Sequence, residues 1–184
     1  MNIVEAVKTT GEAETISRKL SLNAKGNPLY ADIWRFGVNT ALRISDLLSL
    51  KFDDVTGDNL TIKESKTGKT RYIDLNSSAK AIIERRRKAH PAHTFLFQVD
   101  SNRAKGKAVS RVAVGAAFKA VGDEMSLQLG THSMRKTRGW LMYNGGVSIE
   151  MICKTLNHSS PAVTMAYIGI TRAEVAAMYH EFVF

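Results

Sequence analysis

Apolar positions recur at steps of three and four residues over much of the chain, a spacing that places them on one face of a helix. Asn27-Pro28 is typical of a helix start, because Asn can cap and Pro is favoured in the first turn. The stripe that follows comprises Leu29, Ile33, Phe36, Gly37 and Thr40. A second short helix is expected from Ser45 to Leu50.

The pattern then changes to short β-rich runs at Asn59–Glu64 and Thr70–Leu75. The residues between them include Gly68, which can adopt the positive φ that a tight turn needs. The two runs therefore predict an antiparallel hairpin, with Lys66 at its tip.

Helical patterns resume after the hairpin. Ser77 is the expected cap of a helix ending near Ala89, with Ile82 and Ile83 inward and Arg85–Lys88 largely outward. Further helices are predicted at Ser110–Val121, Ser133–Asn144, after Ser148, after Ser160-Pro161 and from Thr171 onward, and Thr94–Phe97 reads as a short buried strand. The predicted fold class is α+β, mostly α-helical with a small antiparallel β-sheet.

Composition narrows the class of protein. With 184 residues and 44% hydrophobic residues, the chain is of single-domain size and can bury a core. No apolar stretch approaches the roughly 20 residues of a transmembrane helix, and a single cysteine, Cys153, excludes an intrachain disulfide framework. We therefore expect a cytoplasmic protein with no membrane partner.

Charge indicates a polyanionic partner. Lys and Arg total 26 against 17 Asp and Glu, and Thr61–Arg111 alone holds 13 basic and 4 acidic residues. A positive sector of this kind is typical of nucleic-acid binding. Its candidate DNA contacts are Lys63, Lys69, Arg71, Arg103, Lys105, Lys107 and Arg111.

Polar residues at the edges of predicted elements are the candidates for chemistry. Arg43 is followed by Asp46 and Leu47, Lys66 lies in the hairpin, and His132 and Arg135 share one face at a helix start because they are three residues apart. Further along, Leu156-Asn157-His158 precedes Tyr167 by nine residues, counted from the histidine. Each feature alone is weak evidence, but their order and spacing together are specific.

In that order and context the sequence resembles the tyrosine recombinase (phage integrase) family. The resemblance spans about residues 27–184 and implies that family's catalytic-domain fold. It also implies six catalytic residues: Arg43, Lys66, His132, Arg135, His158 and Tyr167. Asn157 stands where the family usually has Gly, and Asn tolerates a positive φ better than most residues.

The resemblance implies a site-specific recombinase that breaks and rejoins double-stranded DNA through a 3′-phosphotyrosine intermediate. Tyr167 is the implied nucleophile, His132 its proton acceptor, Lys66 the general acid to the 5′-oxygen, and His158 a hydrogen-bond donor to the phosphate. Arg43 and Arg135 suit the phosphate because a guanidinium grips two oxygens at once. The reaction needs no cofactor, metal or ATP.

Two other chemistries are not favoured by the sequence. His90 and His93 flank Pro91, which breaks helical ligand spacing, and no carboxylate lies close to them in sequence, so no metal ligands are expected. The chain also has no Gly-rich phosphate loop with a following Lys and Ser or Thr, which argues against an ATPase.

Several expectations concern organisation and partners. We expect residues 1–26 to be a short N-terminal extension, and 27–184 to be the catalytic domain of either a small natural recombinase or a fragment of a longer one. The C-terminal tail is apolar, and the resemblance implies that it contacts a neighbouring protomer in a DNA-bound tetramer, with accessory DNA-bending proteins as further partners; the alternative is that the tail folds back on its own domain. The alternatives are a non-catalytic DNA-binding regulator of the same fold and a type IB topoisomerase-like enzyme.

Overall fold

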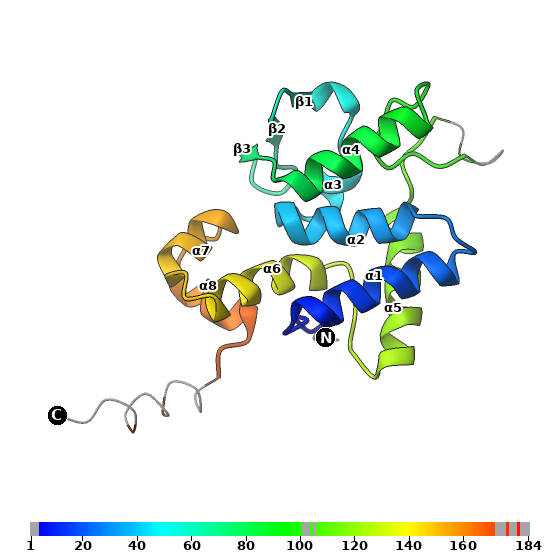
Figure 1. Cartoon of the computed structure of the whole chain (residues 1–184). Helices are drawn as coiled ribbons and strands as arrows, with labels where there is room; N and C mark the ends of the chain where they lie inside the picture. Colours follow the sequence, from blue (N-terminus) through cyan, green and yellow to red (C-terminus); the bar gives the residue numbers. More distant parts are fainter. Residues whose placement is uncertain (1–3, 101–103, 105, 172–175, 177–179, 181–184) are drawn as a thin grey trace.

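The computed structural model describes residues 4–100, 104, 106–171, 176 and 180. In this part of the chain helices predominate and form layers around α2, with one three-stranded sheet at the edge (Figure 1). The α-helices are α1 (Thr10–Asn23), α2 (Leu29–Thr40), α3 (Ile44–Ser49), α4 (Ser77–Ala89), α5 (Arg111–Met125), α6 (Ser133–Asn144), α7 (Ile149–Thr155) and α8 (Pro161–Ile168). The predicted α+β class is confirmed.

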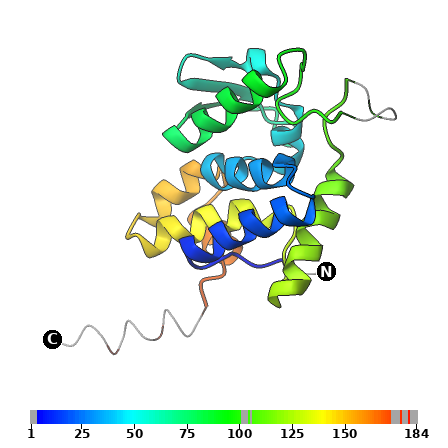
Figure 2. The same ribbon diagram turned by 45° about the vertical axis from the view of Figure 1, so that its right-hand side comes forward.

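Helix α2 is the centre of the molecule, and eight of its twelve residues are buried. Helices α1 and α6 pack on one side of it and α4 on the other, while α5 crosses the ends of α1 and α3 (Figure 2). The core between them includes Trp34 packed edge-to-face on Phe118, and Phe36 packed edge-to-face on Phe97. Ile16 and Leu20 of α1 are fully buried there, so the segment before residue 27 contributes to the same core.

The sheet has the order β1-β2-β3 and is antiparallel throughout. Strands β2 (Asn59–Lys63) and β3 (Thr70–Asp74) confirm the predicted hairpin, and Gly68 has the expected positive φ of 68°. The two-residue strand β1 (Val55–Thr56), which follows the short 3₁₀ turn η1 (Phe52–Asp54), was too brief to predict from the sequence.

Three local predictions were wrong. Residues 94–97 do not form a strand, since Phe95 makes only an isolated bridge with Lys51, although Leu96 and Phe97 are buried. Asn76, not Ser77, caps α4 by accepting a hydrogen bond from the Ala79 amide. Arg86 is buried rather than outward, because it pairs with the buried carboxylate of Asp32.

A second, smaller apolar cluster lies at the other end of α6. Ala41, Ile152, Leu156 and Ile168 form it, and Tyr167 packs against its edge. Helix α6 approaches α7 and α8 closely there because residue 139 is glycine: a Cβ at this position would lie 2.6 Å from Cγ2 of Ile168 and 3.1 Å from Cδ1 of Leu156. The lack of a side chain at Gly139 therefore allows α8, which carries Tyr167, to pack closely against α6.

Replacing Gly139 with Val is expected to destabilise the fold by about 1–3 kcal/mol, the usual cost of overpacking a buried contact. The measurement is the free energy of unfolding in urea. Gly115→Val is the matched control, since a Cβ on Gly115 of α5 meets only a Thr131 methyl group at 3.9 Å. Equal losses in the two variants would contradict the close approach of α6 to α8.

Within the described residues no helix is both long and apolar enough to cross a membrane.

Candidate active site

Two guanidinium groups form the base of the candidate site. Arg135 lies in the first turn of α6, is 2% exposed, and donates from Nη1 to the Ala41 carbonyl at 2.6 Å and from Nη2 to the Leu156 carbonyl. Ala41 ends α2 in the left-handed conformation, which turns the chain sharply toward Arg43. Arg135 thus joins the ends of α2 and α7. Burial lowers its pKa to about 10, so the group stays cationic at neutral pH.

The second guanidinium, Arg43, is held by a carboxylate that sequence reasoning missed. Glu64, directly after β2, is 0% exposed, and its Oε2 lies 2.8 Å from Nη1 of Arg43. The same carboxylate accepts hydrogen bonds from the Thr67 hydroxyl at 2.9 Å and from Nδ2 of Asn157 at 2.6 Å. Burial acts to raise the pKa of Glu64, but these hydrogen bonds and Arg43 together hold it below its ordinary value. Glu64 therefore links the hairpin, the Arg43 turn and the loop before His158.

Asp46 explains the acidic position three residues after Arg43. This carboxylate is buried at the start of α3, and its Oδ1 accepts hydrogen bonds from the Ser65 amide at 2.9 Å and the Ser65 hydroxyl at 2.6 Å. It thereby ties α3 to the hairpin next to Lys66. Lys66 itself is exposed, and its ammonium makes no hydrogen bond or ion pair within the described residues. The charge of Arg43 acts on Arg135, His158 and Tyr167, whereas no interaction joins Lys66 to another candidate within the described residues.

Tyr167, near the end of α8, lies between the two histidines. Its hydroxyl is 3.3 Å from Nδ1 of His132, and its ring packs edge-on against His158 with the centroids 4.8 Å apart. Nδ1 of His158 in turn contacts the Thr164 hydroxyl at 3.0 Å. Asn157 has a φ of 48°, so the positive φ considered for this position is present. His132, His158 and Tyr167 thus lie together although they come from different segments of the chain.

Burial favours the neutral forms of His132, His158 and Tyr167. Burial, and then Arg135 and Arg43, lower the pKa of His158 to about 4. Burial followed by the charges of Arg111, Arg135, Lys136 and Arg43 lowers the pKa of His132. Burial raises the pKa of Tyr167, and the positive charges of Arg135 and Arg43 oppose that rise only in part. A neutral His132 can accept the proton of the Tyr167 hydroxyl, and an anionic ligand would offset the excess positive charge.

The low pKa of His158 predicts how stability depends on pH. The unfolded chain binds this proton with a pKa of about 6.5, more tightly than the folded protein does. The stability due to the neutral ring is therefore complete above about pH 6.5 and is lost as the pH falls toward 4. Urea unfolding at pH 7 and pH 5 should show a larger loss for the wild type than for His158→Gln. The pKa of His132 is also lowered, and His132 is present in both proteins. His158→Gln should therefore still lose some stability between pH 7 and pH 5. The same loss in both proteins would contradict this environment for His158.

The predicted DNA contacts differ in where the structure places their side chains. Lys63, Lys69, Lys107 and Arg111 are exposed, and Arg111 is near enough to affect the pKa of His132. Arg71 instead points inward: it pairs with Glu64 and donates to the carbonyls of Thr40 and Thr155 at 3.1 and 2.6 Å. The guanidinium of Arg71 thus serves the scaffold, and its assignment as a DNA contact is withdrawn. Arg103 and Lys105 lie outside the described residues.

Lys136 is a further basic residue that sequence reasoning missed. Its ammonium lies 5.4 Å from the centre of the Tyr167 ring, in a cation–π position. The signal in the sequence is its spacing, because Lys136 lies four residues after His132 and so shares a face of the helix with it.

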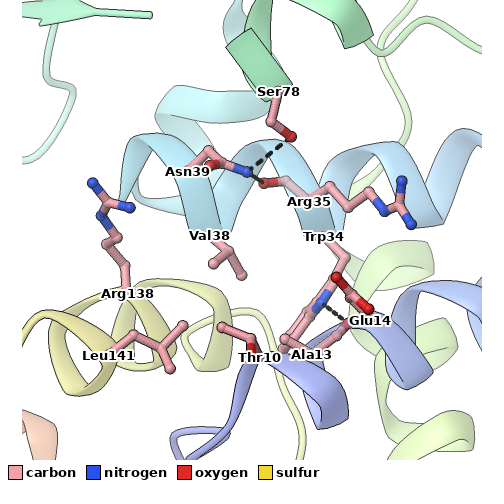
Figure 3. A pocket seen from close by; sticks show the side chains of 10 residues that line it. All are labelled: Thr10, Ala13, Glu14, Trp34, Arg35, Val38, Asn39, Ser78, Arg138 and Leu141. Carbon is pink, nitrogen blue, oxygen red and sulfur yellow. Dashed lines mark hydrogen bonds between the residues drawn. The ribbon is translucent and has the colours of Figure 1, made fainter. Parts of the chain in front are cut away.

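The candidate site is separate from a cavity on one side of α2. A cavity of about 360 Å³ lies between α1, α2 and α6, and Trp34, Asn39, Arg138 and Leu141 are among the residues around it (Figure 3). None of the six candidates lines it.

Known proteins resemble most of this chain in sequence. The model of the phage integrase family matches residues 12–174. The probable integrase/recombinase YoeC of Bacillus subtilis (strain 168) is 35% identical over 184 residues, which cover 99% of this chain and 98% of YoeC. The tyrosine recombinase XerA of Pyrococcus furiosus is 30% identical over 138 residues, or 72% of this chain and 47% of XerA.

Solved structures show the same fold at low sequence identity. A crystal structure of XerA recombinase superposes with a TM-score of 0.73 at 18% identity and covers 97% of this chain and 64% of that one. XerH site-specific recombinase, crystallised on a palindromic difH substrate as a post-cleavage complex, gives 0.73 at 20% identity, with 98% and 54% coverage. The chain thus spans nearly all of YoeC but about half the length of the Xer proteins.

Proposed function

The chain belongs to the phage integrase family, and from that membership we propose that it is a site-specific DNA recombinase that acts through Tyr167. The observation that carries the proposal is the Tyr167 hydroxyl, 3.3 Å from Nδ1 of His132 and beside the buried cation Arg135. These are the parts that phosphodiester cleavage needs: a nucleophile, a proton acceptor and fixed positive charge for the transition state.

The proposed cleavage step is a transfer of one phosphoryl group. The Tyr167 oxygen attacks the scissile phosphorus while its proton passes to His132. The bond from phosphorus to the 5′-oxygen breaks, and Lys66 supplies the proton that makes the leaving group a hydroxyl. The product is a 3′-phosphotyrosine and a free 5′-hydroxyl. Since the protein–DNA bond retains the ester energy, the reverse step rejoins a strand without ATP.

The remaining candidates stabilise the phosphate. Arg43 and Arg135 each have donor groups to offer to phosphate oxygens, and two cations match the charge that develops there. Nδ1 of His158 contacts the Thr164 hydroxyl, which also donates to the Ser160 carbonyl at 3.3 Å. In the tautomer with its proton on Nε2, the His158 ring can donate to the phosphate. Bound DNA also supplies the negative charge that offsets the excess of cations around both histidines.

The partner is therefore double-stranded DNA, bound by the exposed lysines and arginines of the basic sector. Because such contacts release counterions, affinity should fall steeply with salt. A tetramer on DNA, protomer contact through the C-terminal tail, and accessory bending proteins belong to the same proposal. The tail, from residue 172 onward, lies outside the described part except at 176 and 180.

The proposal is tested with nicked or bubble-containing DNA from the flanks of the protein's own gene, in EDTA and without ATP. We expect a protein–DNA adduct that survives SDS. Binding without an adduct on several such substrates would favour the non-catalytic regulator. An adduct accompanied by relaxation of supercoiled DNA, with no exchange between two sites, would favour the topoisomerase-like alternative.

A further inference from the structure

A second polar cluster lies away from the candidate active site, where α4 ends. His90 caps the C-terminus of α4, His93 follows in the next turn, and Asp100 reaches both rings. Oδ1 of Asp100 is 2.6 Å from Nε2 of His93, and Oδ2 is 3.3 Å from Nδ1 of His90. The expectation that no carboxylate accompanies this histidine pair was wrong, because the chain folds back on itself between residues 93 and 100.

We propose that His90, His93 and Asp100 form a binding site for a divalent transition-metal ion, of which Zn²⁺ is the representative. One ligand atom from each residue lies within 4.8 Å of the others. Two imidazoles and a carboxylate suit zinc and its neighbours rather than Mg²⁺ or Ca²⁺, which prefer oxygen ligands throughout. Three protein ligands leave a fourth coordination position for water.

The backbone holds the three residues in place without an ion. The amide of His93 donates to the His90 carbonyl at 3.0 Å, which closes the turn around Pro91. On the other side of the cluster, the amide of Val99, the residue before Asp100, donates to the Lys107 carbonyl at 3.2 Å. The ligand set therefore loses little backbone entropy on binding, which favours affinity.

Exposure differs between the ligands in a way that allows an ion to enter. The side chain of His93 is 8% exposed, whereas those of His90 and Asp100 are 35% and 65% exposed. The nearby buried Arg86 is paired with Asp32, and this pairing limits its competition with a metal ion for the carboxylate of Asp100.

Binding requires one local rearrangement. The two rings are stacked, with centroids 4.4 Å apart and planes 9° from parallel, so their lone pairs do not yet converge. Rotation about the Cβ–Cγ bonds, mainly of the more exposed His90, would direct both nitrogens toward Asp100. The ion then replaces the hydrogen bond between His93 and Asp100.

The test is isothermal titration of ZnCl₂ into chelator-treated protein that carries no polyhistidine tag. We expect one equivalent of Zn²⁺ to bind at micromolar concentration. His90→Ala, His93→Ala and Asp100→Asn should each weaken binding by at least about tenfold, since loss of even a supporting contact costs a metal site that much. His180→Ala and Asp53→Asn are the matched controls, because both residues lie outside the cluster, and they should bind as the wild type does.

Circular dichroism shows whether each variant is folded. The visible absorption of bound Co²⁺ is a second readout of metal coordination. No binding by the folded wild type, or unchanged binding by a folded His90→Ala/His93→Ala double variant, would overturn the proposal. The recombination chemistry proposed for Tyr167 proceeds in EDTA, so the two proposals can fail independently.

Discussion

Tyr167→Phe is expected to abolish covalent attachment to DNA while leaving the fold and DNA affinity nearly unchanged. The substitution removes one oxygen, which is the proposed nucleophile, and keeps the ring that packs on His158. The lost contact to Nδ1 of His132 spans 3.3 Å, so it should cost no more than about 1 kcal/mol of stability.

The measurement is the SDS-stable adduct on nicked DNA, with gel-shift affinity and thermal unfolding as parallel readouts. Tyr72→Phe is the matched control, because Tyr72 is 77% exposed on β3. This control should form the adduct at the wild-type rate. An adduct that persists in Tyr167→Phe would place the nucleophile elsewhere.

Arg135→Ala is expected to lower the cleavage rate by at least about 10²-fold, the usual effect of removing one donor to a transition-state oxyanion. It should also destabilise the fold by about 1–3 kcal/mol, because the buried carbonyls of Ala41 and Leu156 lose their donor. Arg135→Lys separates the two effects, since it retains the charge but not the two-pronged geometry. We expect this variant to recover part of the stability and little of the rate.

Cleavage by these variants is measured on a nicked substrate at saturating protein, with unfolding in urea as the second readout. Arg18→Ala, on the exposed side of α1, is the control for removing a guanidinium. A normal cleavage rate in folded Arg135→Ala would refute the active-site assignment.

Local signals in the sequence were sufficient for the elements that carry the site. Ser148 and Ser160 cap α7 and α8, and Gly169 ends α8 in the left-handed conformation, as their residue types predict. The hairpin follows from alternation of apolar residues and from Gly68. These features depend on neighbours in the chain, and such neighbours are visible without a structure.

Buried charge was harder to predict, because it depends on partners distant in sequence. Glu64 continues the inward alternation of Leu60 and Ile62, so a signal was present, although carboxylates face solvent in most proteins. Arg71 lies on the partner strand, and its inward guanidinium becomes intelligible only once Glu64 is known to be buried. The burial of Arg86 likewise becomes intelligible only once its distant partner Asp32 is known to be buried.

Two other misses have different physical causes. Leu96 and Phe97 are apolar and buried, yet bridge pairing within residues 94–97 is limited to Phe95, so composition alone overestimated regular structure. Asp100 meets His90 and His93 through a chain reversal that no local pattern specifies. Spacing in sequence therefore could not exclude a ligand set there.

The most direct test of the central claim is mass spectrometry of the wild-type adduct after nuclease and protease digestion. The account predicts one modified peptide, with a nucleotide joined through its 3′-phosphate to the Tyr167 oxygen, formed in EDTA and without ATP. A nucleotide attached to any other residue, or joined through a 5′-phosphate, would contradict it.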